Sequence, residues 1–529
     1  MSTERDADRP AKARGPWPWI AALMAAAAVS VLLLRPRRSG EGPEPPQPAP
    51  QAADADFETD VRRFCSQHHA FTPPDLFASR IWAKQIDRMY EFGGYPPAGG
   101  PSVPPRDRVL AYFQSRAPAE AVHPRGQSER GPGPLRFRRR TFTPSGAPPT
   151  PAVSHVRWVR RGDSNRSDLL YCDMRHGRVA RVRFDAPEPQ EVLLAKVPHP
   201  GRATPVDLDR NGALDFLISD LGSFDPADHD RGQIIWLRAE KSGGFSAIPL
   251  AQKLARVADA QAVDLDGDGD LDLAAAVFGF RKTGGVLFLR NSSAEPGSFK
   301  FTGYTLDPRP GSLQVPIVDL DRDGRPDIVT PLAQEFETVE AILNRGPGAP
   351  FEPKTIWTAP HPALGSAGIE IADLDADGDL DAIHASGDTL DSSQLVPWQG
   401  VRWLENRGGF PFAERLFEQL PGCHGLRVVD LDGDGDLDIV ASAFLPTIKW
   451  NEGRRAFGLE SVIWLEQVKK GEFARHSLET LTCDFTTLDV ADFDGDGDQD
   501  IALGSFALIP DQIGTIAEWI VLLENVTKG

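Results

Sequence analysis

The residues with the clearest chemistry in this chain are aspartates at fixed spacing. The stretch from Val263 to Leu273 reads VDLDGDGDLDL and places five carboxylates in eleven residues. Like charges this close raise one another's pKa and oppose folding unless a cation neutralises them. Written as D-x-D-x-D-G-x-x-D, the stretch offers four side-chain ligands, with Gly269 at the bend and the carbonyl of Asp270 as a further donor. The pattern predicts a metal-binding loop.

The donor atoms indicate the ion. Oxygen-only coordination from a flexible loop suits Ca²⁺, whereas Mg²⁺ prefers tighter octahedral geometry and zinc or copper prefers His or Cys. An EF-hand begins in the same way, but it requires a Glu at the twelfth position, where this chain has Ala275, and a helix on each side. The flanks AQAVDL and LDLAAAVF are short apolar runs that predict strands instead. We therefore expect a calcium loop between two strands.

The same loop occurs six times, at intervals of 54 to 62 residues. Self-similarity at a period of tens of residues indicates a repeat architecture. One side-chain ligand is an amide, Asn211, and the others are carboxylates. The predicted calcium ligands are Asp207, Asp209, Asn211 and Asp215; Asp264, Asp266, Asp268 and Asp272; Asp319, Asp321, Asp323 and Asp327; Asp373, Asp375, Asp377 and Asp381; Asp430, Asp432, Asp434 and Asp438; and Asp492, Asp494, Asp496 and Asp500.

Each repeat contains, in chain order, an apolar strand, the acidic loop, a second strand, a third strand with an aromatic residue, and a fourth strand. Four antiparallel strands per repeat predict a blade of a β-propeller. We interpret the aromatic residues, which fall at one place in the repeat, as packing between blades rather than as a ligand platform. They are Trp236, Phe288, Trp403, Trp464 and Trp519.

A seventh, degenerate repeat precedes the six. The stretch from Val153 to Asp173 has the same strand, loop and strand, and it keeps Asp168 at the last ligand place. The first three ligand places hold Arg160, Gly162 and Ser164, so we expect this loop to bind no calcium.

The last repeat ends one strand short, while PLRFRRRTFTP near the start of the repeats resembles a fourth strand. We predict that Leu135 to Thr143 completes the last blade, which would close the ring without free edges. With these residues, the chain from Pro134 onward resembles the FG-GAP/VCBS repeat proteins, a group that includes the seven-bladed propeller of integrin α-subunits. The resemblance implies a propeller braced by calcium at one end, with the loops of the other end free to bind a partner that it does not specify.

The charge of the chain agrees with bound cations. The formal net charge is −19, and 23 carboxylates occupy the ligand places of the six loops. Six Ca²⁺ ions would add 12 positive charges and leave about −7, which relieves the self-repulsion of the ring. No basic patch interleaved with aromatic residues occurs, so we expect no binding to nucleic acid.

The N-terminal region predicts a membrane anchor. Trp17 to Leu34 is a run of 18 uncharged residues, and Arg35, Arg37 and Arg38 follow it in place of a cleavage site. An uncleaved signal anchor is therefore favoured over a removed signal peptide. Calcium loops of extracellular modules bind at roughly 10⁻⁴ to 10⁻³ M, which places the bulk of the chain outside the cytoplasm. The predicted regions are the anchor at 1–38, a Pro-rich linker at 39–54, a helical segment at 55–122, a linker at 123–133 and the propeller at 134–529.

The helical segment raises the question of a haem. A c-type site requires C-x-x-C-H, and this segment has C-x-x-H-H from Cys65 to His69. The segment resembles small cytochrome c-like domains, which implies Cys65 as a single thioether and His69 and Met89 as axial ligands if haem c is bound. The missing second cysteine favours a domain that has lost its cofactor. Separately, Cys423 and Cys483 lie in neighbouring repeats and could form a disulfide.

No serine nucleophile elbow, H-E-x-x-H or phosphate-binding glycine loop occurs, so we do not expect an enzyme. The sequence predicts a mainly β protein: a seven-bladed β-propeller with calcium-binding loops, a small α-helical N-terminal segment and one transmembrane helix. Its predicted function is that of a membrane-anchored, extracytoplasmic module for binding protein or carbohydrate. The alternatives are a haem-linked electron-transfer protein and a glycan-acting enzyme that uses the loops opposite the calcium. Candidate residues in those loops are His229, His384, Asp388, Trp398, Lys449 and Trp450.

Overall fold

The computed structural model describes residues 52–66, 70–93, 103–119, 131, 133–162, 164–184, 188–293, 299–388, 396–445, 458–508 and 518–527. The chain divides into two compact units, Met1–Ala55 and Asp56–Gly529. The predicted anchor and most of the Pro-rich linker lie outside the described residues. Among the helices that the structure does describe, none is long and apolar enough to cross a bilayer.

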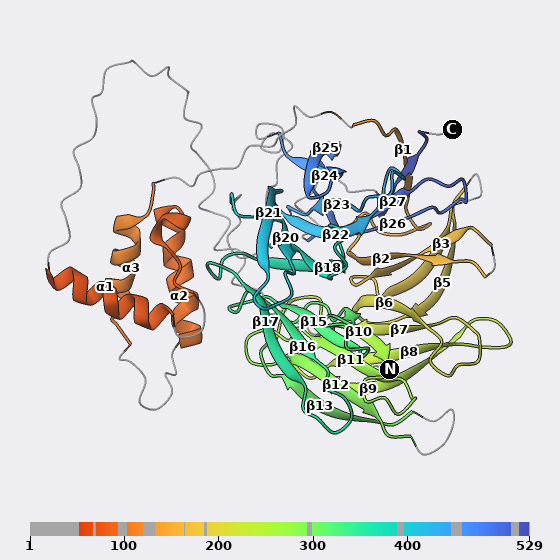
Figure 1. Cartoon of the computed structure of the whole chain (residues 1–529), viewed down its shortest axis with the longest axis horizontal. Helices are drawn as coiled ribbons and strands as arrows, with labels where there is room; N and C mark the ends of the chain where they lie inside the picture. The colour runs from red at the N-terminus through yellow and green to blue at the C-terminus, as the bar shows by residue number, and fades with distance from the viewer. Residues whose placement is uncertain are drawn as a thin grey trace, which may run out of the picture. The chain divides into compact units, whose positions relative to one another are not determined.

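Seven four-stranded antiparallel sheets form the propeller, and six of them are made of strands consecutive in the chain (Figure 1). This confirms the predicted fold. The first three blades contain β2 (Val153–Arg160), β3 (Ser167–Asp173), β4 (Arg178–Arg183) and β5 (Gln190–Lys196); β6 (Pro200–Val206), β7 (Asp215–Asp220), β8 (Gly232–Ala239) and β9 (Phe245–Leu254); and β10 (Val257–Val263), β11 (Asp272–Val277), β12 (Gly285–Asn291) and β13 (Phe301–Asp307). The next three contain β14 (Ile317–Val318), β15 (Asp327–Leu332), β16 (Thr338–Leu343) and β17 (Glu352–Thr358); β18 (Ser366–Ala372), β19 (Asp381–Ser386), β20 (Gly400–Glu405) and β21 (Ala413–Gln419); and β22 (Cys423–Val429), β23 (Asp438–Ala443), β24 (Glu460–Lys469) and β25 (Glu472–Thr480).

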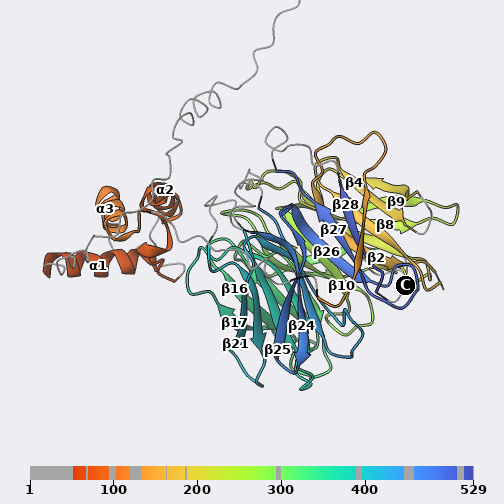
Figure 2. The same cartoon turned by 90° about the horizontal axis from the view of Figure 1, so that it is seen from above.

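The seventh blade joins the two ends of the propeller. Its strands β26 (Phe485–Ala491), β27 (Asp500–Ser505) and β28 (Ile520–Asn525) lie side by side, and β1 (Phe137–Phe142) is the fourth (Figure 2). In the β1–β28 pair, Phe137 lies opposite Asn525 and Phe142 lies opposite Ile520. The predicted closure by the segment from Leu135 to Thr143 is confirmed.

The core lies between the blades. In each of the six acidic repeats all six residues of the second strand are buried, because both faces of that strand are covered. The predicted aromatic residues of the third strands are buried as well, which confirms their role in packing. One of them does not share the common place. In the register of β27 with β28, Leu522 occupies the place of Trp464, and Trp519 lies three residues earlier, where its indole N–H donates to the carbonyl of Pro148 (3.1 Å).

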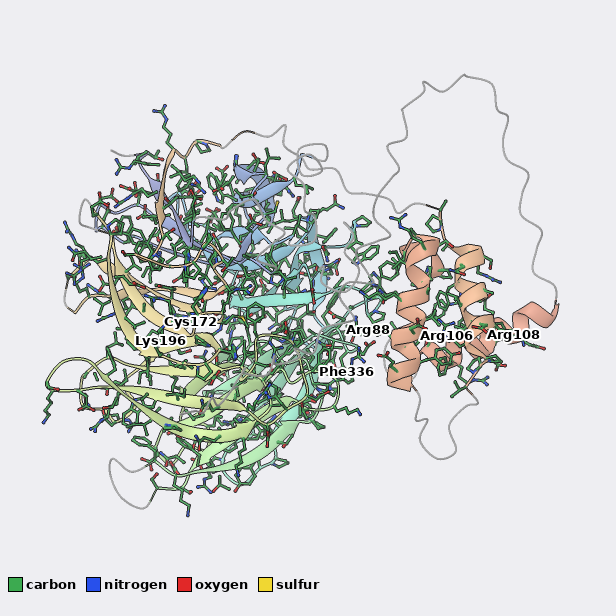
Figure 3. The ribbon with its side chains drawn as sticks, turned by 180° about the vertical axis from the view of Figure 1, so that it is seen from behind. Arg88, Arg106, Arg108, Cys172, Lys196 and Phe336 are labelled. Carbon is green, nitrogen blue, oxygen red and sulfur yellow. The ribbon has the colours of Figure 1, made fainter. Side chains whose placement is uncertain are left out.

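The helical segment consists of α1 (Ala52–Cys65), η1 (Pro74–Leu76), η2 (Ser79–Ile81), α2 (Trp82–Gly93) and α3 (Arg106–Arg116), as the amphipathic pattern predicts. Arg106 of α3 donates to Asp87 of α2 (2.7 Å), and Arg108 of α3 lies 4.0 Å from the ring centre of Phe57 in α1 (Figure 3). These contacts hold the three helices around a shared apolar interior.

The predicted disulfide is wrong. All four cysteines are buried thiols, including Cys172 on β3 (Figure 3). Cys423 and Cys483 belong to one apolar cluster, as their neighbouring repeats suggest. The Cys483 thiol instead donates to the carbonyl of Glu460 (3.5 Å).

Candidate metal sites and the opposite end

The six acidic loops occupy equivalent places in six blades. Each loop connects an inner strand to the second strand of its blade, and its last ligand is the first residue of that second strand. Asp264 thus follows β10, and Asp272 begins β11. The predicted strand, loop and strand arrangement is confirmed, and it brings the ligand residues of each loop together at one end of the ring.

The first aspartate of each loop organises the backbone. Asp264 accepts the N–H groups of Gly267 (2.8 Å) and Gly269 (3.0 Å), and the first aspartates of the other five loops accept equivalent bonds from inside their own loops. Gly269 has a φ of 96°, in the left-handed region that glycine adopts without steric cost. The glycine of the motif is therefore required by the turn.

The last aspartate is buried and connects the loop to the rest of the blade. Asp272 accepts the N–H of Leu265 in its own loop (3.0 Å) and that of Asn291 at the end of β12 (2.7 Å). Burial raises the pKa of Asp272 to about 6, that of Asp438 to about 7 and that of Asp500 to about 8. A buried carboxylate in this position gains stability from a cation.

The carboxylates converge closely enough to hold an ion. In several loops, one oxygen atom from each of three aspartates lies within 4.8 Å of the others. The second aspartates supply an independent indication, because the Oδ1 atoms of Asp209, Asp375 and Asp494 are buried and have no hydrogen-bond partner among the described residues. The donors are all oxygen, which fits a hard cation such as Ca²⁺. The converging groups include Asp207, Asp209 and Asp215; Asp264, Asp266 and Asp272; Asp319, Asp321 and Asp327; Asp373, Asp375 and Asp377; and Asp430, Asp432 and Asp438.

The degenerate first blade neutralises its buried carboxylate differently. Arg161 donates to Asp168 Oδ1 through Nε (2.9 Å) and Nη2 (2.6 Å), and Arg183 Nε lies 3.7 Å from the same atom. Asp168 is 6% exposed, so this ion pair is largely shielded from water. The expectation of no calcium in this loop thus has a physical basis, because a guanidinium already serves as the cation.

Two sets of residues that hydrogen-bond to the acidic loops were not predicted from the sequence. A residue at or near the end of each third strand donates its backbone N–H to the last aspartate, at 2.7 to 2.8 Å in all six loops. Four of these residues are asparagines, and the signal was the recurring N in FLRN, AILN, WLEN and LLEN. They are Asn291, Asn344, Asn406 and Asn525.

The second set consists of two tryptophans of the third strands. The indole N–H of Trp236 donates to Asp215 (2.8 Å), and that of Trp403 donates to Asp381 (2.9 Å). These side chains therefore hold the last carboxylate in place in addition to packing between blades. The spacing alone predicted only the packing.

The residues predicted to bind a partner at the opposite end do not form one group. His384 is not in a loop: it lies inside β19, fully buried, with Nε2 3.0 Å from Ser366 Oγ and with a pKa that burial lowers to about 3. Trp398 is half-buried and donates to the carbonyl of Ala363 (2.8 Å), while His229 contacts Ser223 Oγ (2.8 Å). Asp388 ends the described part of its loop. Lys449 and Trp450 lie outside the described residues.

The described part of the helical segment does not fit covalent haem. Cys65 is 4% exposed and packs among aromatic and aliphatic side chains, and burial raises the pKa of its thiol to about 12. The rings of Trp82 and Phe113, 4.1 Å apart, fill this interior, and Met89 packs against it. His69 lies outside the described residues.

Comparisons with known proteins agree with the repeats. A family model described as an FG-GAP-like repeat matches residues 264–330, which contain two of the acidic loops. The match leaves out the helical segment, so the resemblance to cytochrome c-like domains gains no support. No curated protein matches the chain.

Solved structures with distant likeness include BBS1N in complex with ARL6DN, at 10% identity and a TM-score of 0.40, covering 74% of this chain and 96% of that chain. The V. cholerae biofilm matrix protein Bap1 has 10% identity and a TM-score of 0.40, covering 74% of this chain and 91% of that chain. The rhamnogalacturonan lyase YesW has 13% identity and a TM-score of 0.36, covering 74% and 72%. The assignment of seven blades rests on the strand pairing described above.

Proposed function

We propose that this chain is a membrane-anchored, extracytoplasmic β-propeller that binds about six Ca²⁺ ions at one end and a protein or carbohydrate partner at the other. The observation that carries the calcium proposal is the repeated convergence of aspartate oxygens around buried, unpartnered oxygen atoms such as Asp209 Oδ1. Bound calcium would neutralise these groups and hold each turn rigid. The predicted ligands are aspartates at the four ligand places, with Asn211 in the first loop.

The loops opposite the calcium end support the binding proposal. Phe224 stacks on Phe506 with ring centres 6.0 Å apart, and Phe444 meets Phe506 edge to face at 5.4 Å, although the three residues come from three blades. Asp228, in the same loop as Phe224, joins it to the loop between β11 and β12 by accepting the N–H groups of Lys282 and Thr283 (2.9 Å each). Loops held on a rigid scaffold, with aromatic side chains among them, are typical of recognition surfaces.

The extracytoplasmic location rests on the apolar run at 17–34 and on the weak affinity expected of such loops. Protease treatment of intact cells or spheroplasts that express the full chain tests it. We expect the propeller to be digested from the outside. Protection of the propeller until the membrane is lysed would contradict the location.

Elemental analysis of the full-length protein, dialysed to equilibrium against calcium at ten times Kd and corrected for the calcium of the outer buffer, tests the calcium proposal. We expect about six calcium ions per chain, and fewer than two would contradict it. Protein and glycan arrays then test the binding end, with Phe224→Ser as the variant. Tyr304→Ser is the matched control, because Tyr304 is 49% exposed on the outer strand β13. Binding that both variants reduce equally would exclude the proposed surface.

A further inference from the structure

A cavity of about 280 Å³ lies among the inner strands of the blades. Its lining comes from β2, β6, β10, β18, β22 and β26, from the segment that precedes β14, and from Leu221 and Phe506, which follow β7 and β27. The polar side chains in this lining include His155, Arg202, Gln314 and Arg427. We call this space the axial cavity.

His155 presents an unused hydrogen-bond donor in the axial cavity. The side chain is 2% exposed, and its Nδ1 accepts the N–H of Ala203 at 3.4 Å. Burial, together with the guanidinium groups of Arg202, Arg157 and Arg427, keeps the pKa of His155 well below its ordinary value, so the ring is neutral. The proton of a neutral ring that accepts at Nδ1 is on Nε2. That atom is buried and has no hydrogen-bond partner among the described residues.

The carboxylates beside Arg427 and Arg202 already accept hydrogen bonds within the protein. Arg427 donates to Asp489 through Nε (2.7 Å) and also to Glu370, so one guanidinium bridges the two. Asp259 accepts the N–H of Val315 (3.1 Å) and the side-chain amide of Gln261 (3.0 Å). Asp489, Glu370 and Asp259 therefore already have donors within the protein.

Arg202, in contrast, has side-chain N–H groups without a hydrogen-bond acceptor among the described residues. Its side chain is 22% exposed, and its nearest carboxylate is Asp259, 3.6 Å from Nε, which is longer than a hydrogen bond. Burial lowers the pKa of Arg202; the charges of Asp259 and Glu370 oppose this shift, and those of Arg427 and Arg157 add to it. A ligand that supplies negatively charged oxygen atoms would satisfy both Arg202 and His155.

We propose that the axial cavity binds a small oxyanion, either a carboxylate or a tetrahedral group such as sulfate or phosphate, between the Nε2–H of His155 and the guanidinium of Arg202. Buried polar groups in native proteins nearly always have a partner, and this anion is the partner that the lining lacks. The two proposed contact residues lie on β2 and β6, and neither belongs to the acidic loops or to the loops of the opposite end. The site therefore stands whether or not the proposed function is correct.

Equilibrium dialysis of the full-length protein with radiolabelled sulfate or acetate, at constant ionic strength in chloride, tests this site. Sulfate replaces phosphate because phosphate precipitates calcium, which is kept at 1 mM, roughly the Kd of extracellular calcium loops. The variant Arg202→Gln removes the charge, while Asp259 keeps its other donors. The variant His155→Phe keeps the ring volume and removes Nε2–H, which provides a second test if Arg202→Gln does not fold. Arg415→Gln is the control, because Arg415 is an exposed arginine on the outer strand β21.

We expect one anion per chain, about tenfold weaker binding for Arg202→Gln or His155→Phe, and unchanged binding for Arg415→Gln. Tighter binding of sulfate would identify a tetrahedral oxyanion, and tighter binding of acetate a carboxylate; both support the site. Failure of both anions to bind the native chain would overturn the proposal. Equal weakening by Arg202→Gln and Arg415→Gln would also overturn it, because binding would then follow net charge alone.

Discussion

The first and third blades place an aspartate at the same buried position but surround it with different groups. In the third blade, Asp272 is buried behind a loop of further carboxylates and accepts the backbone N–H groups of Leu265 and Asn291. In the first blade, Asp168 sits at the equivalent place, and Arg161 donates two hydrogen bonds to it. If calcium binds as proposed, the carboxylate at this point is neutralised in both blades. The cation comes from solution in the third blade and from an arginine of the chain in the first.

A third buried carboxylate, Glu337, has no arginine partner among the residues that the structure describes. It accepts the backbone N–H (2.8 Å) and the hydroxyl (2.7 Å) of Ser366, and it is 3% exposed. Burial raises its pKa to about 8, so it is protonated at neutral pH. The three cases differ in what supplies the missing positive charge, and each predicts a different dependence on conditions.

Removal of calcium from the whole chain should have the largest effect. At ten times Kd each site adds about 1.4 kcal/mol to the free energy of unfolding, so six sites add about 8 kcal/mol. We expect EDTA to lower Tm strongly and to increase hydrogen exchange in the six acidic loops but not in the loop that contains Arg161. Equal exchange in all seven loops would remove the distinction between a cation from solution and an arginine of the chain.

The Arg161→Gln substitution should lower the free energy of unfolding by about 2 kcal/mol, because it leaves the buried Asp168 without its main partner. The loss should be the same in calcium and in EDTA, as measured by chemical denaturation. Arg166→Gln, an exposed change in the same loop, is the control and should have little effect. A loss that appears only in calcium would mean that the first blade also binds the ion.

Replacing Asp266 and Asp268 together by Asn should lower the free energy of unfolding by about 1.4 kcal/mol in calcium at ten times Kd. The same change should leave stability almost unaltered in EDTA, because the lost contribution is that of one ion. Elemental analysis should show one calcium fewer per chain. An equal drop of Tm in both buffers would indicate that these aspartates act through the fold and not through a metal.

Glu337 should make the stability of the chain depend on pH. Its folded pKa of about 8 exceeds its ordinary 4.5, so the folded chain holds a proton that the unfolded chain loses between those values. Stability should therefore fall as pH rises through this window, by up to about 1.4 kcal/mol per unit. Glu337→Gln should flatten the profile at constant calcium, whereas Glu472→Gln, an exposed control, should not. A profile unchanged by Glu337→Gln would contradict the protonated state.

Features that depend on local spacing could be predicted from the sequence. The D-x-D-x-D-G-x-x-D loop, its six copies and the missing strand at 135–143 all follow from short patterns that repeat. Features that depend on where a side chain points could not. The stretch RRGDSNR does not reveal which arginine reaches Asp168, and HASGD gives no sign that His384 still belongs to the strand. The recurring asparagine was visible in the sequence. The hydrogen bond from its backbone N–H to the last aspartate depends on the pairing of strands, which the sequence does not show.

The closure by β1 and β28 determines how the ring responds to force. Both ends of the propeller leave from the same edge of this antiparallel pair, since Phe137 lies opposite Asn525. Tension applied through the two ends, such as between an anchored N-terminus and a load on the C-terminus, pulls the pair apart one rung at a time rather than shearing all of its hydrogen bonds together. The propeller therefore opens first at the strand that closes it, and the other six blades remain folded while the seventh yields.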